Sequence, residues 1–366
     1  MQIFLSKTST VIYQKIAKPM LFALDPETAH NLTLKSASLS GKIPPINSIL
    51  KASWAYQDPI LEQNTDGIFY ANPIGLAAGW DKDAQAITLM GNIGFGFSEV
   101  GSITKYPYDG NPGKKLWRLK ESKSILVYYG LKNKGVDNLA PKIARAKSNI
   151  PIGTNIARTN SPNCDDKSSI EDYAYSFDKL KDIGDYFTIN ISCPNTYGGQ
   201  PFHDTKRLGL LLKELESIPT KKPVYVKISP DITQKERQGI AELAGKYRVH
   251  GFICGNLTKN RNLPTIKDSN IPDIGGMSGK VVQQLSDQLI SDMYKYSQGT
   301  KTIIGLGGVF NGQDAYRKIK LGASLVQMIT GLIYQGPQVV GQINKQLVEL
   351  LRQDGYSNIK DAVGKV

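Results

Sequence analysis

From residue 72 onward, short apolar runs alternate with amphipathic stretches, and this regularity constrains the fold more than any other feature of the chain. The runs have the length and composition of buried strands and occur at Ile74–Ala78, Phe97–Ile103, Ile150–Ile156, Tyr186–Ile191, Val224–Ile228, Gly251–Cys254, Thr302–Leu306 and Ser324–Ile329. Apolar strands joined by helical crossovers indicate a parallel sheet that is buried on both faces. Eight such units in succession predict a (β/α)8 TIM barrel. A doubly wound open sheet is the alternative, but no GxGxxG motif follows the first strand.

Most of the expected strands are followed by a stretch of helical periodicity. We expect helices at Asp83–Met90, Asn138–Lys147, Ser169–Asp182, Lys206–Glu216, Gln234–Tyr247, Lys280–Tyr296, Gln313–Leu321 and Gln338–Leu351. Thr233 and Asn311 precede two of them and are suitable N-caps.

The first 45 residues differ in pattern from the rest. Lysines at positions 7, 15 and 18 are interspersed among the apolar residues Phe4, Leu5, Val11, Ile12, Ile16, Met20, Leu21, Phe22 and Leu24. Asp25, followed by Pro26, is a suitable N-cap for a second helix. Two short amphipathic helices with lysines on the polar side predict an element that lies in a membrane interface. The alternative is a helical arm that packs against the main domain.

Gly41–Pro45 has the composition of a linker, which divides the chain into two parts. We expect residues 1–45 to form a helical, membrane-associating extension and residues 46–366 to form the barrel.

Composition narrows the partners and the location. The formal net charge of +13 suits an anionic lipid surface, whereas no arginine patch with interleaved aromatic residues points to nucleic acid. Three cysteines without a CxxC motif indicate a reducing compartment. With no run of transmembrane length, we expect a peripheral protein on the cytoplasmic side of the cell membrane, or otherwise a cytoplasmic one. The sequence leaves the oligomeric state open.

Polar residues follow the expected strands at the end where TIM barrels carry their reactive groups. Lys82 and Lys227 come from two such strand ends, and buried lysines are costly unless an anion pairs with them. Glycine turns at Gly307–Gly308 and Gly331 follow strands seven and eight, the usual place for a phosphate. These features favour a phosphorylated cofactor. The three histidines are scattered, and no cluster suits a metal.

The fourth strand ends in the segment Asn190-Ile-Ser-Cys193-Pro-Asn195. Each asparagine amide can donate and accept hydrogen bonds, and the thiol between them can transfer a proton. This arrangement suits a planar substrate with amides and a carboxylate. The alternative is an ordinary turn after a strand, since Pro-Asn-Thr is common in turns.

Seven motifs together make the chain resemble the dihydroorotate dehydrogenases, flavin enzymes of pyrimidine synthesis, over nearly its whole length. The motifs are Gly75-Leu-Ala-Ala-Gly79-Trp-Asp-Lys82-Asp, Glu99-Val-Gly-Ser102, Gly110-Asn-Pro, Asn190-Ile-Ser-Cys-Pro-Asn195-Thr, Val226-Lys227-Ile-Ser-Pro-Asp, Gly275-Gly-Met-Ser-Gly279 and Ile304-Gly-Leu-Gly-Gly308. The segment Lys18–His30 resembles the helical extension of the membrane-associated, quinone-reducing class.

The resemblance implies that FMN binds in the mouth of the barrel. The implied cofactor contacts are Ala78, Gly79, Lys82, Ser102, Asn155, Asn190 and Lys227 around the ring and ribityl chain, and Gly276, Gly307, Gly308, Ile329 and Thr330 around the phosphate. Dihydroorotate or orotate would be held by Lys82, Asn190, Asn195 and Asn256. The implied catalytic residues are Cys193 as the base, Lys82 and Lys227. Electrons would pass to a quinone near His30 and Arg118.

Several positions depart from the pattern of the family. The quinone-reducing class has serine where this chain has Cys193, whereas the soluble class has cysteine. We expect the nearby lysines to lower the pKa of this thiol. Val127 stands in place of a substrate-binding asparagine, Leu257 and Gly255 each replace a threonine, and Ile329 replaces a tyrosine. Three alternatives follow: a soluble acceptor such as fumarate, a related FMN oxidoreductase that acts on a different cyclic amide, or a non-catalytic flavin-binding barrel.

Overall fold

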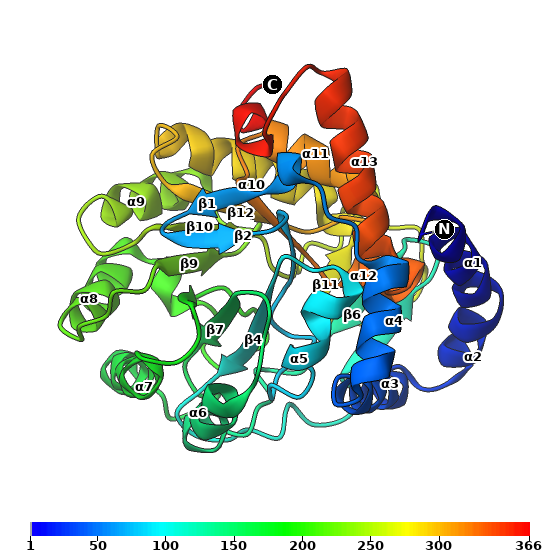
Figure 1. The fold of residues 1–366 in the computed structure, drawn as a ribbon. Coiled ribbons are helices and arrows are strands. Elements are labelled where there is room, and N and C mark those ends of the chain that lie inside the picture. Colours follow the sequence, from blue (N-terminus) through cyan, green and yellow to red (C-terminus); the bar gives the residue numbers. More distant parts are fainter. Residues whose placement is uncertain (1) are drawn as a thin grey trace.

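Eight parallel strands close into a barrel, as the alternation along the sequence predicts (Figure 1). The computed structural model describes residues 2–366, with side chains from residue 6 onward. The strands follow one another around the barrel in chain order: β3 (Ile74–Leu76), β4 (Phe97–Ile103), β7 (Ile152–Ile156), β8 (Tyr186–Asn190), β9 (Val224–Ile228), β10 (Gly251–Cys254), β12 (Thr302–Leu306) and β13 (Leu325–Met328). The prediction of a TIM barrel is confirmed, and four of the eight strands have the predicted bounds.

An outer ring of helices surrounds the strands (Figure 1). Its members are α5 (Ile87–Met90), α6 (Val136–Arg145), α7 (Asp166–Leu180), α8 (Thr205–Glu216), α9 (Gln234–Ala244), α10 (Gln283–Tyr296), α11 (Gly312–Lys320) and α13 (Val339–Gln353). Thr233 forms a capping box with Glu236, and Asn311 accepts the N–H of Asp314, so both predicted caps are confirmed. Helix α5 is shorter than predicted because the carboxylate of Asp81 accepts the N–H groups of residues 85 and 86 and stabilises a turn there.

The N-terminal end of the barrel is closed by a hairpin and a plug of aromatic side chains. The hairpin pairs β1 (Gln63–Thr65) with β2 (Ile68–Tyr70). Tyr70 meets Phe97 edge to face with ring centroids 5.4 Å apart, and Tyr186 meets Tyr225 in the same way at 5.4 Å. These large buried rings leave the opposite end of the barrel as the place for a site.

A small antiparallel sheet, which the sequence pattern does not predict, lies at the C-terminal end of the barrel strands. It joins β5 (Leu116–Leu119), β6 (Ser124–Val127) and β11 (Gly276–Gly279) in the order β11-β6-β5. The short helix α12 (Thr330–Gln335) follows the last barrel strand. Tyr334 in this helix donates to the carbonyls of Leu119 and Ser124, which ties α12 to the small sheet.

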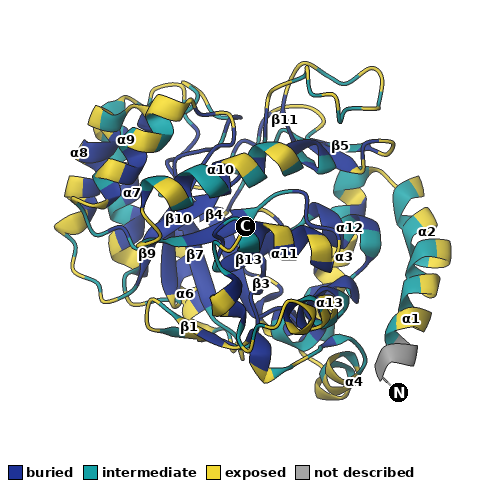
Figure 2. Ribbon diagram, turned by 90° about the horizontal axis from the view of Figure 1, so that it is seen from above, coloured by how far each residue is buried: buried dark blue, intermediate teal, exposed yellow. Residues whose placement is uncertain are grey.

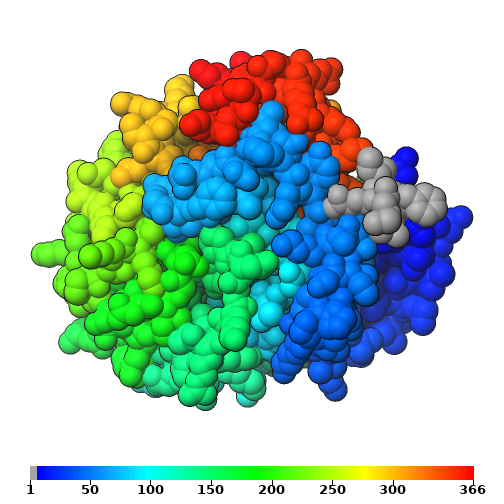
Figure 3. Space-filling view, viewed as in Figure 1, coloured from blue at the N-terminus to red at the C-terminus, as the bar shows by residue number. Residues whose placement is uncertain are grey.

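The N-terminal helices lie at one edge of the barrel (Figure 1, Figure 3). α1 (Gln2–Ile12), a π-helical turn (Tyr13–Ala17) and α2 (Lys18–Ala23) follow directly on one another, and then come α3 (Pro26–Ser40) and α4 (Pro44–Trp54). Asp25 caps α3 by accepting the N–H of Glu27 and Thr28, as predicted. The expected linker is a tight turn, because α4 begins at Pro44 and continues the helical region to Trp54.

The first helical segment rests on the barrel through polar contacts and leaves apolar side chains in solvent. The hydroxyl of Tyr13 donates to the carbonyl of Ile333 at 2.6 Å, and Gln14 donates to that of Tyr334 at 2.9 Å. No side chain from Tyr13 to Ala23 is buried (Figure 2). The side chains of Phe4 and Leu5 lie outside the described residues. No helix in the described chain combines the length and apolarity that a membrane span requires.

Candidate active site

A cavity of about 1220 Å³, counting its open mouth, lies at the C-terminal end of the barrel strands. It brings together most of the residues that the sequence singles out. Its lining includes Ala78, Gly79, Lys82, Ser102, Asn190, Cys193, Asn195, Lys227, Asn256, Gly307, Gly308, Ile329, Thr330 and His30. Asn155, Gly276 and Arg118 do not line this cavity.

The floor of the cavity is organised by Glu99, a fully buried carboxylate inside the barrel. It accepts hydrogen bonds from Asn155 Nδ2 at 2.7 Å, Thr188 Oγ1 at 3.0 Å and Gln327 Nε2 at 2.9 Å. A carboxylate can only accept, so the amide of Asn155 must turn its NH₂ group toward Glu99. The carbonyl oxygen of Asn155 is then left to accept from the hydroxyl of Ser102.

This direction of hydrogen bonding continues to the cavity surface. Because Ser102 donates to Asn155, its oxygen accepts from Asn190 Nδ2, at 2.8 Å. The carbonyl oxygen of Asn190 accepts in turn from the N–H and hydroxyl of Ser192, at 3.2 and 3.0 Å. Asn155 thus sits behind the cavity wall and orients two residues that do line it.

Cys193 lies between Asn190 and Asn195 and faces the cavity from a partly buried position. Burial raises the pKa of its thiol, and the opposing effects of the N–H of Asn195 and the charge of Lys227 do not offset this. The lysines do act to lower the pKa, as expected, but burial outweighs them and the net pKa is raised. The physical reason is that the thiolate loses more solvation in this pocket than the cations return.

Two lysines line the cavity, Lys227 from β9 and Lys82 from the segment after β3. Burial lowers the pKa of Lys227, an effect that Glu99 and then Cys193 oppose, and no ion pair joins Lys227 to a carboxylate in the described residues. Burial also lowers the pKa of Lys82, to about 8. The ammonium of Lys82 lies 4.2 Å from the ring centroid of Tyr129 and 3.4 Å from Nε2 of His30.

One end of the cavity is built from glycines in conformations that other residues avoid. Gly307 and Gly308 have φ angles of 124° and 71°. A side chain at Gly331 would meet the carbonyl of Val309 at 2.0 Å. Ser278 Oγ lies 2.7 Å from Thr330 Oγ1 at the same end. Close-packed backbone with exposed N–H groups and hydroxyls is suited to a phosphate.

The run from Gly275 to Gly279 contributes different residues from those expected. Ser278 and Gly279 line the cavity, whereas a side chain at Gly276 would meet Leu257 at 2.6 Å and Pro194 at 3.3 Å. Gly276 therefore packs beside the Cys193 segment, away from the glycine end. Sequence reasoning missed Ser278 and Gly279 as lining residues, although both belong to the glycine-rich run that it singled out.

Apolar residues form the wall opposite the barrel strands. Val127 pairs with Gly276 in the small sheet, and Leu257 lies against Gly276, so Val127 and Leu257 are neighbours in this wall. The carbonyl of Val127 accepts from Asn195 Nδ2 at 2.8 Å, while Oδ1 of Asn195 has no partner in the described residues. The backbone at Val127 thus holds Asn195 with one of its polar atoms unused.

A second cavity, of about 1290 Å³ with its mouth, lies between the N-terminal helices and the barrel. Its wall is mostly apolar, and it shares His30, Trp80, Leu116, Ile125 and Ile333 with the first cavity. Burial and the charge of Lys82 lower the pKa of His30 to about 3, so the imidazole is neutral. His30 and Lys82 mark the boundary between the two cavities.

Arg118 lines this second cavity and fixes the end of α2. Its guanidinium donates to the carbonyls of Leu21, Phe22 and Leu24 at 2.9, 3.3 and 2.8 Å. It also lies 4.6 Å from the ring centroid of Phe22. These contacts hold the C-terminal end of α2 at the cavity. Within the described chain, no three His, Cys, Asp or Glu side chains gather as metal ligands.

Comparison with known proteins gives one consistent result. The family model for dihydroorotate dehydrogenase matches residues 60–351. The "Dihydroorotate dehydrogenase (quinone)" of Gloeobacter violaceus is 36% identical over 356 residues, which cover 96% of this chain and 98% of that protein. The protein of the same name from Christiangramia forsetii is 37% identical over 92% of this chain and 99% of its own length.

Solved structures agree with these sequence matches. The DHODH of Eimeria tenella in complex with ferulenol superposes with a TM-score of 0.84 at 30% identity, covering 93% of this chain and 95% of the other. The ligand-free form from the same organism gives a TM-score of 0.84 at 31% identity, covering 93% and 99%.

Proposed function

The chain belongs to the dihydroorotate dehydrogenase family, and from this premise we propose how its residues divide the work. The enzyme oxidises dihydroorotate to orotate in pyrimidine biosynthesis, with a quinone as electron acceptor. One observation carries the assignment of roles. Lys82, Cys193 and Lys227 converge with three asparagine amides in one cavity, and that cavity meets a second, apolar cavity at His30.

The first cavity fits FMN as the cofactor. Lys227 is a buried cation without an ion-pair partner in the described residues, and such a group is stabilised by negative charge on a bound molecule. The glycine end supplies backbone that a phosphate can approach closely, with the hydroxyls of Ser278 and Thr330 beside it. Gly307, Gly308 and Thr330 would hold the phosphate, while Ala78, Gly79, Ser102 and Asn190 would contact the ring system and ribityl chain.

Bound FMN would supply a hydride acceptor that a second oxidant can later restore. The residues of the chain do the remaining work. Asn190, Asn195 and Asn256 present amides that can pair with the amide and carboxylate groups of the substrate. Lys82 and Lys227 add positive charge to the cavity lining, which stabilises negative charge as it develops during the reaction.

Cys193 is the base in this proposal. Its thiolate takes the proton from the carbon beside the carboxamide carbonyl, so that the C–H bond breaks and an S–H bond forms. The backbone N–H of Asn195 and the charge of Lys227 favour the thiolate, while burial opposes it. The balance gives a base of raised pKa. Such a base is stronger once deprotonated, but a smaller fraction of it is deprotonated at neutral pH.

The second cavity fits the ring of a quinone. Apolar side chains from α2, α3, α4 and the barrel line it, and the neutral imidazole of His30 offers one polar contact at the inner end. Arg118 keeps α2 in place over the cavity. We assign the acceptor site to this cavity because a quinone there would lie beside the flavin site without entering it.

The exposed apolar side chains of the N-terminal helices suit a bilayer surface. Ile16 and Met20 are 57% and 67% exposed, and Val11 and Ile12 are each more than half exposed. A peripheral position on the cytoplasmic side of the membrane would bring the second cavity close to quinone dissolved in the lipid. Purified protein tests the function directly: dihydroorotate should be oxidised with a short-chain quinone, and no turnover with any acceptor would refute it.

A further inference from the structure

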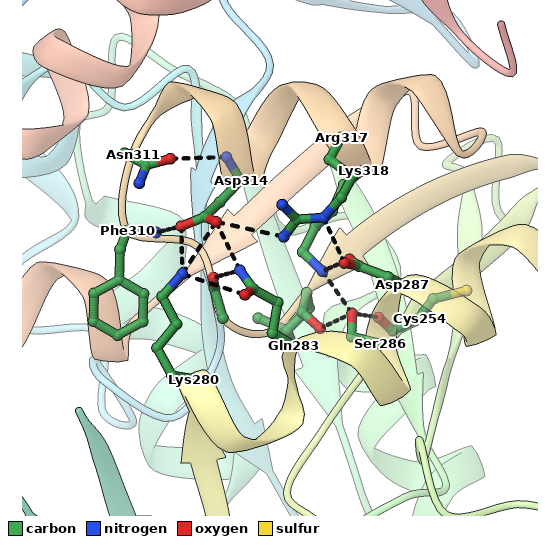
Figure 4. A network of polar contacts seen from close by, with 12 residues as sticks. Cys254, Lys280, Gln283, Ser286, Asp287, Phe310, Asn311, Asp314, Arg317 and Lys318 are labelled. Atoms are coloured by element: carbon green, nitrogen blue, oxygen red, sulfur yellow. Dashed lines mark hydrogen bonds and ion pairs between the residues drawn. The ribbon is translucent and has the colours of Figure 1, made fainter. Parts of the chain in front are cut away.

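A network of polar side chains lies behind the glycine end of the cavity, outside the site described so far (Figure 4). It joins the start of α10 and the first turns of α11 to the loop that follows β12. Gln283, the first residue of α10, donates through Nε2 to the carbonyl of Gly308. Gly308 and Val309 line the cavity, whereas Gln283 does not.

The amide of Gln283 is held in one orientation by two charged neighbours. Lys280 Nζ donates to Gln283 Oε1 at 3.3 Å, and Asp314 Oδ1 accepts from Gln283 Nε2 at 2.8 Å. An ammonium can only donate and a carboxylate can only accept, so the two groups together force the NH₂ end of Gln283 toward Gly308. Lys280 and Asp314 also pair directly, with 2.9 Å between Nζ and Oδ2.

The same carboxylate fixes a second point of the loop. Asp314 Oδ2 accepts the N–H of Phe310 at 3.0 Å, and the side chain of Asp314 is 6% exposed. Farther along α10, Ser286 donates to the carbonyl of Leu306 at 2.6 Å. Ser286 donates there because it accepts from the buried ammonium of Lys318, at 2.9 Å. The end of β12 at Leu306 and the following loop at Gly308 and Phe310 are therefore held from outside the cavity.

The hydrogen bond from Gln283 to the carbonyl of Gly308 also sets the orientation of the peptide between Gly308 and Val309. In a trans peptide the C=O and N–H groups point in opposite directions. Because Gln283 holds the carbonyl of Gly308 toward α10, the N–H of Val309 in the same peptide points away from α10. Gly308 has a φ of 71°, a backbone conformation that glycine adopts freely and that could otherwise change to other orientations.

We propose that Gln283, oriented by Lys280 and Asp314, is a positioning residue for the phosphate of the cofactor. It does not touch the phosphate. It sets the direction of the Gly308–Val309 peptide so that the N–H faces the anion, and this preorganised donor stabilises the bound dianion more than a mobile loop would. The inference rests on the proposed function, because it takes the bound group to be FMN.

The experiment compares FMN with riboflavin, which has the same ring system and ribityl chain but no phosphate. Full-length protein depleted of flavin is titrated with each ligand while flavin fluorescence is followed. The variant is Gln283→Glu, which keeps the size of the side chain but removes the donor to Gly308. The matched control is Gln284→Glu, which makes the same change at an exposed residue of the same helix.

For Gln283→Glu we expect the affinity for FMN to fall about tenfold, because the N–H of Val309 would no longer be held toward the phosphate and its hydrogen bond to that anion would be weakened. The affinity for riboflavin should be unchanged. The control should bind both ligands as the unaltered protein does. Asp314→Asn frees the amide of Gln283 and weakens the contact to Phe310. It should therefore also lower the affinity for FMN relative to that for riboflavin.

Two results would overturn the inference. One is an unchanged ratio of FMN to riboflavin affinity in both Gln283→Glu and Asp314→Asn. The other is an equal loss of both affinities in both variants, which would mean that the network only maintains the fold. Failure of the proposed function is read separately: an unaltered protein that binds FMN but is not reduced by dihydroorotate contradicts the function alone, whereas an unaltered protein that binds neither flavin contradicts both.

Discussion

The ammonium of Lys82 lies 3.4 Å from Nε2 of His30, at the boundary between the two cavities. Lys82 comes from the segment after the first barrel strand, and His30 comes from α3 in the N-terminal extension. The contact therefore joins the two parts of the chain that the sequence divides. It also places the neutral imidazole where one side faces the barrel mouth and the other faces the apolar cavity.

The first prediction concerns the base. Cys193→Ala should bind FMN normally but reduce it with dihydroorotate about 10²–10⁴ times more slowly, which is the usual contribution of a general base. Rapid mixing under anaerobic conditions measures this half-reaction without the quinone. Cys164→Ala is a suitable control, because that partly exposed thiol does not line either cavity. Reduction at the unaltered rate would remove Cys193 from this role.

The second prediction concerns pH. The pKa of Cys193 is raised, so only a small fraction is thiolate at neutral pH. Since the deprotonated form is active, the rate of flavin reduction should increase about tenfold per pH unit from roughly pH 6 to pH 8. A rate that is already constant over this range would mean that the thiol pKa is low. Cys193→Ala, which leaves no group to deprotonate at this position, should lose this pH dependence along with most of the rate.

Much of the fold follows from the sequence because barrel units are local. Each apolar run and its helix identify themselves within about 40 residues, and four strands such as Val224–Ile228 have their predicted bounds. The small sheet does not follow from the sequence, because its strands are only four residues long and Gly276 pairs with Val127 from far along the chain. Local periodicity carries no signal for such a pairing.

The candidate site likewise contains features that the sequence predicts and features that it does not. Strand ends meet in any parallel barrel, so Lys82, Cys193 and Lys227 are brought together by topology alone. The pKa of Cys193 is different, because it depends on how burial compares with the distance to each cation, and a sequence lists only the cations. The sequence marks Glu99 only as part of a motif, and nothing in that motif shows that Glu99 orients Asn155 and, through it, Ser102.

The third prediction follows from that buried carboxylate. Glu99→Leu would leave donors of Asn155, Thr188 and Gln327 without an acceptor, at about 1–3 kcal/mol for each unsatisfied group. The free energy of unfolding in urea should therefore fall by about 3 kcal/mol or more. Thr188→Val, which removes one donor and leaves Glu99 in place, should cost about 1 kcal/mol. An equal, small loss in both variants would contradict the role given to Glu99.

The fourth prediction separates the two cavities. Thr33 in α3 lines the second cavity, so Thr33→Phe should obstruct it and lower the rate of quinone reduction. Reduction of the flavin by dihydroorotate should be unchanged, because Thr33 does not line the first cavity. Asn31→Phe places the same ring on an exposed position of α3 outside the cavity and serves as the control. Equal quinone rates in the two variants would place the acceptor elsewhere.

The fifth prediction concerns the membrane surface. Replacing both Ile16 and Met20 by glutamate should abolish cosedimentation with liposomes, because charged side chains do not enter the apolar part of a bilayer interface. Leu210→Glu makes the same kind of change at a residue of α8 that is 59% exposed, and it should leave liposome binding intact. Retained binding by the double variant would show that another surface meets the lipid.

The measurement that tests the account most directly is an anaerobic absorbance spectrum of the purified protein before and after addition of dihydroorotate. We expect a bound flavin whose visible absorbance bleaches on addition of the substrate, despite the apolar wall that Val127 and Leu257 form. A bound flavin that dithionite bleaches and dihydroorotate does not would contradict the assignment of this cavity to dihydroorotate.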